Sequence, residues 1–408
     1  MNQAEAVRRI TGEIRERINS EMSDKDDEEV REAIVRYVLS HEDVSLLSIC
    51  EKSEIIDTVY NRVRKDLSIL QPFADDREVS EIMVNGRDAI FIEKKGKVYR
   101  VGVSFESAEE LEEVIRRIAA KVHREINELN PILDARLEDG SRINAVYKNV
   151  ALNGPSLTIR KFPENRITME DLLRFGTINK DAADFLRVLV IAGYNIFISG
   201  GTSSGKTTFL NVLSNYIPQD ERIVVIEDSA ELQITEIENI VRLECRNANV
   251  QGKGGVTMRH LIKSSLRMRP NRIIVGEVRG EEVLDMIQAM NTGHDGSLST
   301  GHANSPKGMI CRLEAMYLQA ADFPVEAIRR QISEAIEIII HLGKTAEGFR
   351  KVLEISEVSG MAEGEIVLNP LYRYDAEHEL TPTGNRLGND MKLRRRGLSL
   401  VAVKKTGS

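Results

Sequence analysis

The chain has 408 residues, which at about 150 residues per domain predicts about two or three domains with cores of their own. Asp and Glu outnumber Lys and Arg by 64 to 56, and the net charge of -8 disfavours nucleic acid as the main partner. No apolar run approaches the ~18 residues of a membrane span, residues 1–21 lack the apolar core of a secretory signal, and the three cysteines form no CxxC pair. We therefore expect a cytosolic chain without a disulfide framework, a zinc site or a bilayer-crossing segment.

Residues 1–65 carry apolar positions at helical spacing and are predicted to form a small helical region. The apolar positions of the first two amphipathic helices are Val7, Ile10, Ile14 and Ile18, and then Val30, Ile34, Tyr37 and Val38. A third helix is predicted to begin after Ser53 as its cap, and its apolar face consists of Ile56, Val59, Val63 and Leu67.

Residues 66–162 change to short β-rich runs around one long helix, which is the pattern of an α/β domain with an antiparallel sheet. The predicted strands cover 81–85, 89–93, 97–103 and 157–162, and the predicted helix covers 108–125. A linker is predicted over 163–178, because it starts with a proline and polar residues and ends where Asn179 or Thr177 can cap the next helix.

Residues 179–345 contain apolar runs without alternation, separated by helical patterns, at 195–199, 222–227, 272–278 and 296–300. Because strands of this kind are buried on both faces, they predict a mostly parallel, doubly wound α/β sheet. Residues 346–408 are expected to form a C-terminal extension, with hairpin-like segments at 351–358 and 365–371 before a basic tail. The basic residues of this tail are Arg394, Arg395, Arg396, Lys404 and Lys405.

Residues 200–208 read GGTSSGKTT and fit the phosphate-binding pattern GxxxxGK[ST], between a predicted strand and a predicted helix. The predicted nucleotide-binding residues are Gly200, Gly201, Thr202, Ser203, Ser204, Gly205, Lys206, Thr207 and Thr208. In such a loop the backbone N–H groups converge on the phosphates of ATP, Lys206 reaches the β and γ phosphates, and Thr207 holds Mg²⁺. A glycine-rich turn without a ligand is the alternative, which the strand-loop-helix context disfavours.

Two acidic groups follow predicted strands that neighbour this loop. Glu277 ends the run 273–277, and Glu227 and Asp228, followed by Glu231, end the run that starts at 222. Ligands of open α/β sheets gather at the carboxyl ends of the strands, so these acids are candidates to hold the metal or a water. An acid at a strand end is often only a helix cap or a solvated residue, but two of them beside a complete phosphate loop favour the functional interpretation.

Two histidines, His294 and His302, flank the small-residue run 297–300. A histidine at each end of a strand beside the nucleotide can donate a hydrogen bond to the γ-phosphate and respond to its loss. A packed or solvated histidine is the alternative. A zinc site is less favoured, because no further Cys or acidic ligands stand at a suitable spacing.

These motifs together resemble those of the type II/IV secretion ATPases. GGTSSGKTT at 200–208, IEDSAEL at 226–232, LRMRPNRIIVGEVRG at 266–280 and NTGHDGSLSTGHANS at 291–305 resemble the family's Walker A motif, Asp box, Walker B motif and His box. The Walker B glutamate and the paired histidines are highly specific to that superfamily. DARLEDGSRIN at 134–144 and LTIRKF at 157–162 resemble the CpaF-type branch, the ATPases of tight-adherence (Flp) pilus systems. The resemblance covers about residues 66–360.

The resemblance implies a RecA-like P-loop ATPase domain behind a smaller α/β domain, with ATP and Mg²⁺ as ligands. Lys206 and Thr207 would bind phosphates and Mg²⁺, and Glu277 would hold metal or water. Glu227 or Glu231 would act in water activation, and which glutamate is the base stays open.

The resemblance further implies that His302 and His294 sense or bridge the nucleotide, and that the chains form a homohexameric ring. In such rings the amino-terminal domain closes over the nucleotide and its arginines reach the γ-phosphate; the matching positions are Arg142 and Arg160, with Arg124 as a third candidate. The ring would work in the cytoplasm at the inner face of the plasma membrane, on an inner-membrane platform protein, to power pilus assembly or protein secretion.

Three other functions fit the sequence less well. A RecA-like nucleic-acid motor, a helicase or translocase, is disfavoured by the acidic balance, by 5% aromatic residues and by the lack of Trp for base stacking. A GTPase switch is disfavoured because Asn179-Lys180-Asp181 has its Asp one place too early for the NKxD motif of GTPases, and because this segment precedes the phosphate loop. A scaffold with an inactive nucleotide site conflicts with the full set of acids and histidines.

Overall fold

The computed structural model describes residues 9–14, 26–45, 47–162, 166–246, 253–345, 347–375 and 379–400. The chain divides into two compact units, Met1–Glu164 (unit 1) and Asn165–Ser408 (unit 2). Among the described residues, no helix is long and apolar enough to cross a membrane.

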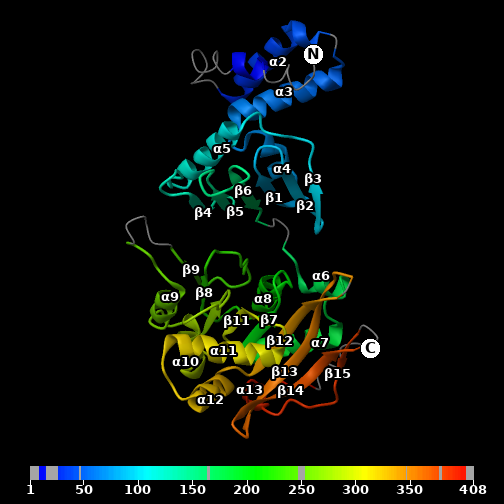
Figure 1. Ribbon diagram of the computed structural model, residues 1–408. Helices are drawn as coiled ribbons and strands as arrows, with labels where there is room; N and C mark the ends of the chain where they lie inside the picture. Colours follow the sequence, from blue (N-terminus) through cyan, green and yellow to red (C-terminus); the bar gives the residue numbers. More distant parts are fainter. Residues whose placement is uncertain are drawn as a thin grey trace. The chain divides into compact units, whose positions relative to one another are not determined.

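Unit 1 combines amino-terminal helices with a small sheet (Figure 1). Its helices are α2 (Asp27–Ser40), η1 (Glu42–Val44), α3 (Ile49–Arg64), η2 (Ser68–Leu70), α4 (Gln71–Asp75) and α5 (Ala108–Lys121). Its strands are β1 (Val79–Asn85), β2 (Ile90–Lys94), β3 (Lys97–Arg100), β4 (Ile132–Arg136), β5 (Arg142–Val146) and β6 (Ser156–Arg160).

The amino-terminal helices share a small core of their own. The buried members of this core include Ile10, Ile14, Val30, Ile34, Val38, Ile55 and Val59. The predicted positions Val7 and Ile18 lie outside the described residues. The prediction that Ser53 caps the third helix is wrong: Ser48 is the cap, since its hydroxyl accepts from the N–H of Glu51 while Glu51 accepts from the N–H of Ser48. The first turn leaves Ile49 87% exposed, so the apolar pattern starts later than the helix does.

The sheet of unit 1 is antiparallel throughout, as the sequence predicts, in the order β3-β2-β1-β6-β5-β4. The helix α5 contributes Leu111, Val114 and Ile118 to the core cluster that includes the sheet residues. This helix ends at Lys121, earlier than predicted, because His123 adopts a left-handed backbone with φ +54 that cannot continue it. The strands β4 and β5 were not predicted.

Unit 2 is a large mixed sheet with helices on both faces. Its helices are α6 (Met169–Arg174), α7 (Lys180–Ala192), α8 (Lys206–Ser214), α9 (Met258–Ser265), α10 (Glu282–Asn291), α11 (Pro306–Ala320), α12 (Val325–Ala335) and α13 (Met391–Arg395). Its strands are β7 (Ile196–Gly200), β8 (Ile223–Glu227), β9 (Ile240–Glu244), β10 (Arg272–Val275), β11 (Leu298–His302), β12 (Ile338–Lys344), β13 (Arg350–Ala362), β14 (Glu365–Tyr374) and β15 (Leu380–Pro382).

The strand order is β15-β14-β13-β12-β7-β11-β10-β8-β9. The six strands from β12 to β9 are parallel, and β13, β14 and β15 add antiparallel hairpins. The predicted fold class, a parallel-rich α/β domain preceded by a smaller α/β domain and helices, is confirmed. The helix α6 lies inside the stretch expected to be a linker, and Asn179, not Thr177, caps α7.

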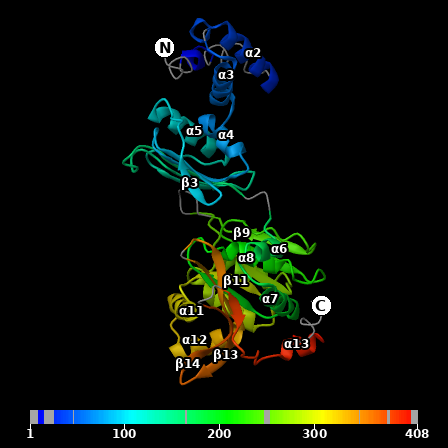
Figure 2. The ribbon, with the colours of Figure 1, turned by 90° about the vertical axis from the view of Figure 1, so that its right-hand side faces the viewer.

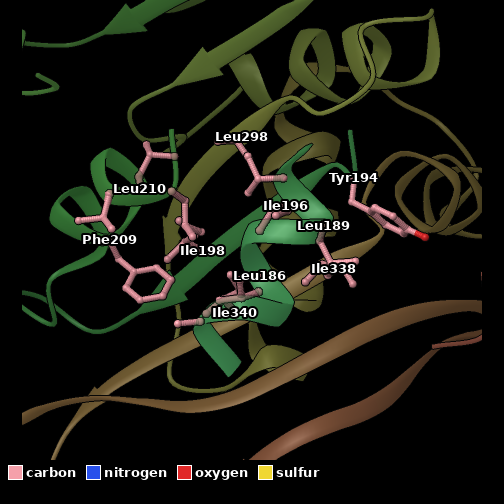
Figure 3. Close-up of a cluster of buried hydrophobic side chains, with 14 of the residues drawn as sticks. Leu186, Leu189, Tyr194, Ile196, Ile198, Phe209, Leu210, Leu298, Ile338 and Ile340 are labelled. Carbon is pink, nitrogen blue, oxygen red and sulfur yellow. The ribbon is translucent and has the colours of Figure 1, made fainter. Parts of the chain in front are cut away.

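Successive residues of the central strands enter two different cores, which explains the apolar runs without alternation. Ile196 and Ile198 pack with α7 and α8 (Figure 3), whereas Phe197 packs with α10, α11 and α12. Figure 2 shows α7 and α11 on opposite sides of the sheet. The carboxyl ends of the parallel strands are thereby held at one edge of a rigid layer.

At the amino ends of the parallel strands, a buried arginine is bonded to a main-chain carbonyl and to a carboxylate. Arg272 is 0% exposed, donates to the carbonyl of Val190 at 2.6 Å and forms two hydrogen bonds with Glu221. Burial raises the pKa of Glu221, but Arg272 and Arg396 outweigh burial and hold that pKa below its usual value. The bonds between Arg272 and Glu221 fix the start of β10. Arg396, which follows α13, also donates to Glu221 and so holds the end of that helix against the sheet.

Replacing Gly296 by Ala is expected to lower the free energy of unfolding by about 3 kcal/mol. Gly296 has φ +80, and a Cβ there would lie 2.5 Å from Nη1 of Arg272. The control is Gly293→Ala, where φ is +97 but no atom lies within 4 Å, so only backbone strain of about 1 kcal/mol is expected. Chemical denaturation measures both variants, and equal losses would contradict the steric part of the prediction.

Candidate functional site

The phosphate-loop motif joins β7 to α8 at the carboxyl edge of the sheet. Gly205 stands at the N-cap of α8 with φ +94, and Ser203 has φ +56. A Cβ on Gly200 would lie 2.5 Å from the carbonyl of Leu342 and 2.5 Å from Oγ of Ser204, so only glycine fits. The first residue of the loop is thus packed directly against β12, which fixes the position where the loop leaves β7.

The side chain of Lys206 lies across this loop. Its Nζ donates to the carbonyl of Gly201 at 3.0 Å and lies 3.2 Å from Nδ1 of His302. The residue is 7% exposed, and burial lowers the pKa of its ammonium group. The ammonium group of Lys206 is therefore held against the loop, where it would contact the phosphate oxygens of a bound nucleotide.

His302 links Lys206 to Glu277. His302 is the cross-strand partner of Gly200, at the end of β11, and Glu277 follows β10, the next strand of the sheet. Nε2 of His302 lies 2.7 Å from Oε1 of Glu277. Because an ammonium group has only donors, Nδ1 of His302 accepts from Lys206 and Nε2 carries the proton that faces the carboxylate. Three predicted site residues are therefore in contact: Lys206, His302 and Glu277.

We expect turnover to stay nearly constant as the pH falls from about 8 to about 6.5, and to decline only at lower pH. Burial lowers the pKa of His302, and Lys206 and Arg279 lower it further, whereas Glu277 opposes them. The imidazole thus stays neutral below its ordinary pKa and gains a proton only as the pH falls through the lowered value. A pH profile of hydrolysis measures this limb, and the limb should disappear in His302→Gln. A midpoint at or above pH 6.5 would contradict the assignment.

Glu227 is held in the fold by the main chain. It is 3% exposed, and its Oε1 accepts from the N–H groups of Glu231 and Leu232 at 2.8 and 2.9 Å. Burial raises its pKa, and the two N–H bonds oppose that rise. This geometry favours a role for Glu227 in shaping the turn after β8, while Glu231 stays partly exposed beside it.

His294 is not brought to this cluster within unit 2. It precedes β11 at the amino end of that strand, whereas His302 stands at the carboxyl end. Its Nδ1 lies 3.1 Å from the carbonyl of Ala289, the last turn of α10. Within unit 2 the two histidines therefore lie at opposite ends of β11, and the role of His294 at the nucleotide stays a prediction.

Two of the three predicted arginines of unit 1 are neighbours of each other. Arg142 on β5 and Arg160 on β6 are cross-strand partners, and Arg160 also pairs in register with Glu81. Arg124 follows the end of α5, where its N–H donates to the carbonyl of Ala119. Arg142 and Arg160 thus form one basic pair, and Arg124 belongs to another part of the unit.

Arg279 is a site residue that the sequence did not single out. Its Nε and Nη2 donate to Oε2 of Glu277 at 3.0 and 2.8 Å, and its Nη1 lies 3.5 Å from Oδ2 of Asp228. It therefore bridges the acids at the ends of β10 and β8. Its position two residues after Glu277, inside the quoted motif 266–280, was the available signal.

The donor set suits Mg²⁺ bound together with a nucleotide. Thr207 is partly exposed in the first turn of α8, and Glu277 supplies a carboxylate at the neighbouring strand end. Within the described ranges, no group of three or more His, Cys, Asp or Glu residues could form a metal cage. One hydroxyl and one carboxylate fit an ion that takes its remaining ligands from phosphate and water.

Comparisons with known proteins show which family the chain belongs to. Residues 63–363 match the family described as "T2SSE: Type II/IV secretion system protein". The chain is 45% identical over 237 residues to the uncharacterized protein MJ0781 of Methanocaldococcus jannaschii, which covers 56% of this chain and 32% of that protein. It is 32% identical over 303 residues to the type IV secretion system protein VirB11 of Brucella suis, which covers 68% of this chain and 84% of VirB11.

The chain spans about a third of the length of the Methanocaldococcus relative. Among solved structures, the Legionella pneumophila ATPase DotB has a TM-score of 0.51 at 20% identity, over 72% of this chain and 80% of DotB, and this likeness shows the fold alone. The family match covers most of both units. The chain belongs to the type II/IV secretion system protein family.

Proposed function

We propose that this chain is an ATP hydrolase whose homohexameric ring powers the assembly of a tight-adherence (Flp) pilus or the secretion of protein through a type II/IV secretion machine. The observation that carries the proposal is the continuous contact of Lys206, His302 and Glu277 beside a complete phosphate loop. In this arrangement a neutral imidazole, that of His302, connects the phosphate-binding ammonium group of Lys206 to the carboxylate of Glu277.

In this proposal the loop N–H groups and Lys206 bind the β and γ phosphates. Thr207 and Glu277 would hold Mg²⁺, which neutralises charge on the phosphates when bound. Arg279 orients the Glu277 carboxylate through two hydrogen bonds to one oxygen. His302 donates from Nε2 and accepts at Nδ1, so a γ-phosphate that draws Lys206 away changes the contacts of His302 as well.

The water-activating base in this proposal is one of Glu227, Glu231 and Glu277, and which of them acts stays open. Glu227 is bonded to the turn after β8 through one carboxylate oxygen, and burial raises its pKa, which suits a general base. Arg142 and Arg160 of unit 1 would meet the charge that develops on the γ-phosphate. The amino-terminal unit would then close over the nucleotide, as the family resemblance implies.

The partners in this proposal are other copies of the chain and an inner-membrane platform protein. The ring would work in the cytoplasm, at the inner face of the plasma membrane. Support comes from the family description and from the name of VirB11, a type IV secretion system protein. The CpaF-type assignment rests on the segments 134–144 and 157–162.

Steady-state phosphate release with and without single-stranded DNA tests this function. The proposal expects Mg-ATP hydrolysis that DNA does not change. Stimulation by DNA would favour the nucleic-acid motor instead. A pull-down from membranes with the Glu277→Gln chain, loaded with ATP, should then retain the platform protein.

A further inference from the structure

The first residues of β13 bring together two parts of unit 2 that are distant in sequence. Nε of Arg350 donates to the carbonyl of Ser203 in the phosphate loop at 3.1 Å. The N–H of Val352 donates to the carbonyl of Thr177 at 2.9 Å, and Nζ of Lys351 donates to the carbonyl of Gly176. The start of β13 is therefore fixed to the turn before α7, and Arg350 extends from this fixed point to the loop.

The peptide between Ser203 and Ser204 has a defined orientation. The N–H of Ser204 faces the carbonyl of Gly201 at 3.4 Å, inside the loop. Since the C=O and N–H of a trans peptide point in opposite directions, the carbonyl of Ser203 points away from the interior, toward Arg350. A phosphate loop needs this orientation at the 203–204 peptide, because a carbonyl oxygen turned toward the bound phosphate would repel it.

The backbone of Ser203 does not favour this conformation by itself. Its φ of +56 is left-handed, which a residue with a Cβ adopts only where surrounding contacts hold it. The hydrogen bond from Arg350 supplies such a contact at the residue concerned. It is a charge-assisted bond, stronger than a bond between neutral groups.

We propose that Arg350 is a positioning residue that holds the Ser203 carbonyl outward and so keeps the phosphate loop ready to bind nucleotide. Arg350 acts through the loop and not on the reacting atoms. Through this residue the C-terminal extension, whose role the sequence did not reveal, takes part in nucleotide affinity. The inference rests on the proposed function, because it takes residues 200–208 as the phosphate-binding loop.

The test compares three variants of the full chain by ADP binding and by steady-state kinetics. Arg350→Ala should raise the Kd for ADP and the KM for ATP about ten-fold, with kcat within about two-fold and unchanged thermal stability. Arg350→Lys should recover most of the affinity, since an ammonium group can donate to the same carbonyl. Lys344 is the exposed cross-strand neighbour of Arg350, so Lys344→Ala removes a nearby charge as the control and should bind ADP like the wild type.

Each outcome decides the proposal. An unchanged Kd for ADP in Arg350→Ala would overturn it, and so would a loss confined to kcat, which would indicate direct contact with the γ-phosphate. An equal loss in Lys344→Ala would show that general positive charge, not loop geometry, sets affinity. If the wild-type chain itself bound no ADP, the proposed function would fail with it, whereas normal wild-type binding with a normal Arg350→Ala variant would overturn the positioning role alone.

Discussion

Glu277→Gln should lower the rate of ATP turnover at least about 100-fold while it leaves nucleotide affinity within a few-fold. The amide keeps the size of the carboxylate but loses the charge that would hold Mg²⁺ and order the water. Lys206 and the loop N–H groups, which supply the ground-state contacts, are unchanged. Phosphate release and equilibrium binding of a fluorescent ATP analogue measure the two quantities separately.

The control for this variant is Glu281→Gln. Glu281 is an exposed acid close in sequence, and it pairs with Arg259 rather than with the cluster. We expect its turnover to match the wild type. Near wild-type turnover in Glu277→Gln would remove this carboxylate from the reaction, and loss of binding together with turnover would indicate a structural defect.

Arg142→Ala or Arg160→Ala should lower turnover roughly 100-fold or more, with ADP affinity nearly unchanged. A guanidinium stabilises charge that develops on the γ-phosphate, and ADP lacks that group. The two residues are cross-strand partners, so a substitution at either one disturbs the same basic pair. Single-turnover hydrolysis and ADP calorimetry measure the two effects.

Arg100→Ala provides the matched control, since Arg100 is an exposed arginine on the edge strand β3 of the same sheet. It should hydrolyse ATP like the wild type. Normal turnover in both Arg142→Ala and Arg160→Ala would contradict the proposal that unit 1 supplies catalytic charge. A rise in the Kd for ADP as large as the fall in turnover would point to lost folding of unit 1.

The central strands were predictable because burial of both faces leaves a continuous apolar run, as in β7 and β8. The strand β9 has partly exposed and charged positions and carries no such run. The strand β12 begins three residues after the end of α12. Its apolar run therefore continues the apolar spacing of Ile328 and Ile332, and the change from helix to strand cannot be seen in the sequence. Sequence periodicity fails where one element passes directly into the next.

The local part of the site was predictable and its tertiary part was not. The loop 200–208 and Glu277 stand in short motifs that define their own geometry. The strand 297–300 was recognised, but only the sheet register shows which histidine, His302, reaches Gly200. Arg350 lies far along the chain from Ser203, and nothing in the sequence links the two.

We propose above that the cluster of Lys206, His302 and Glu277 hydrolyses Mg-ATP in an assembled ring. Phosphate release by the full chain, measured over a range of protein concentrations beside Lys206→Ala, tests it most directly. We expect hydrolysis whose specific activity rises with protein concentration as rings form, and which Lys206→Ala abolishes together with nucleotide binding. Specific activity that does not depend on concentration, or a Lys206→Ala chain as active as the wild type, would contradict it.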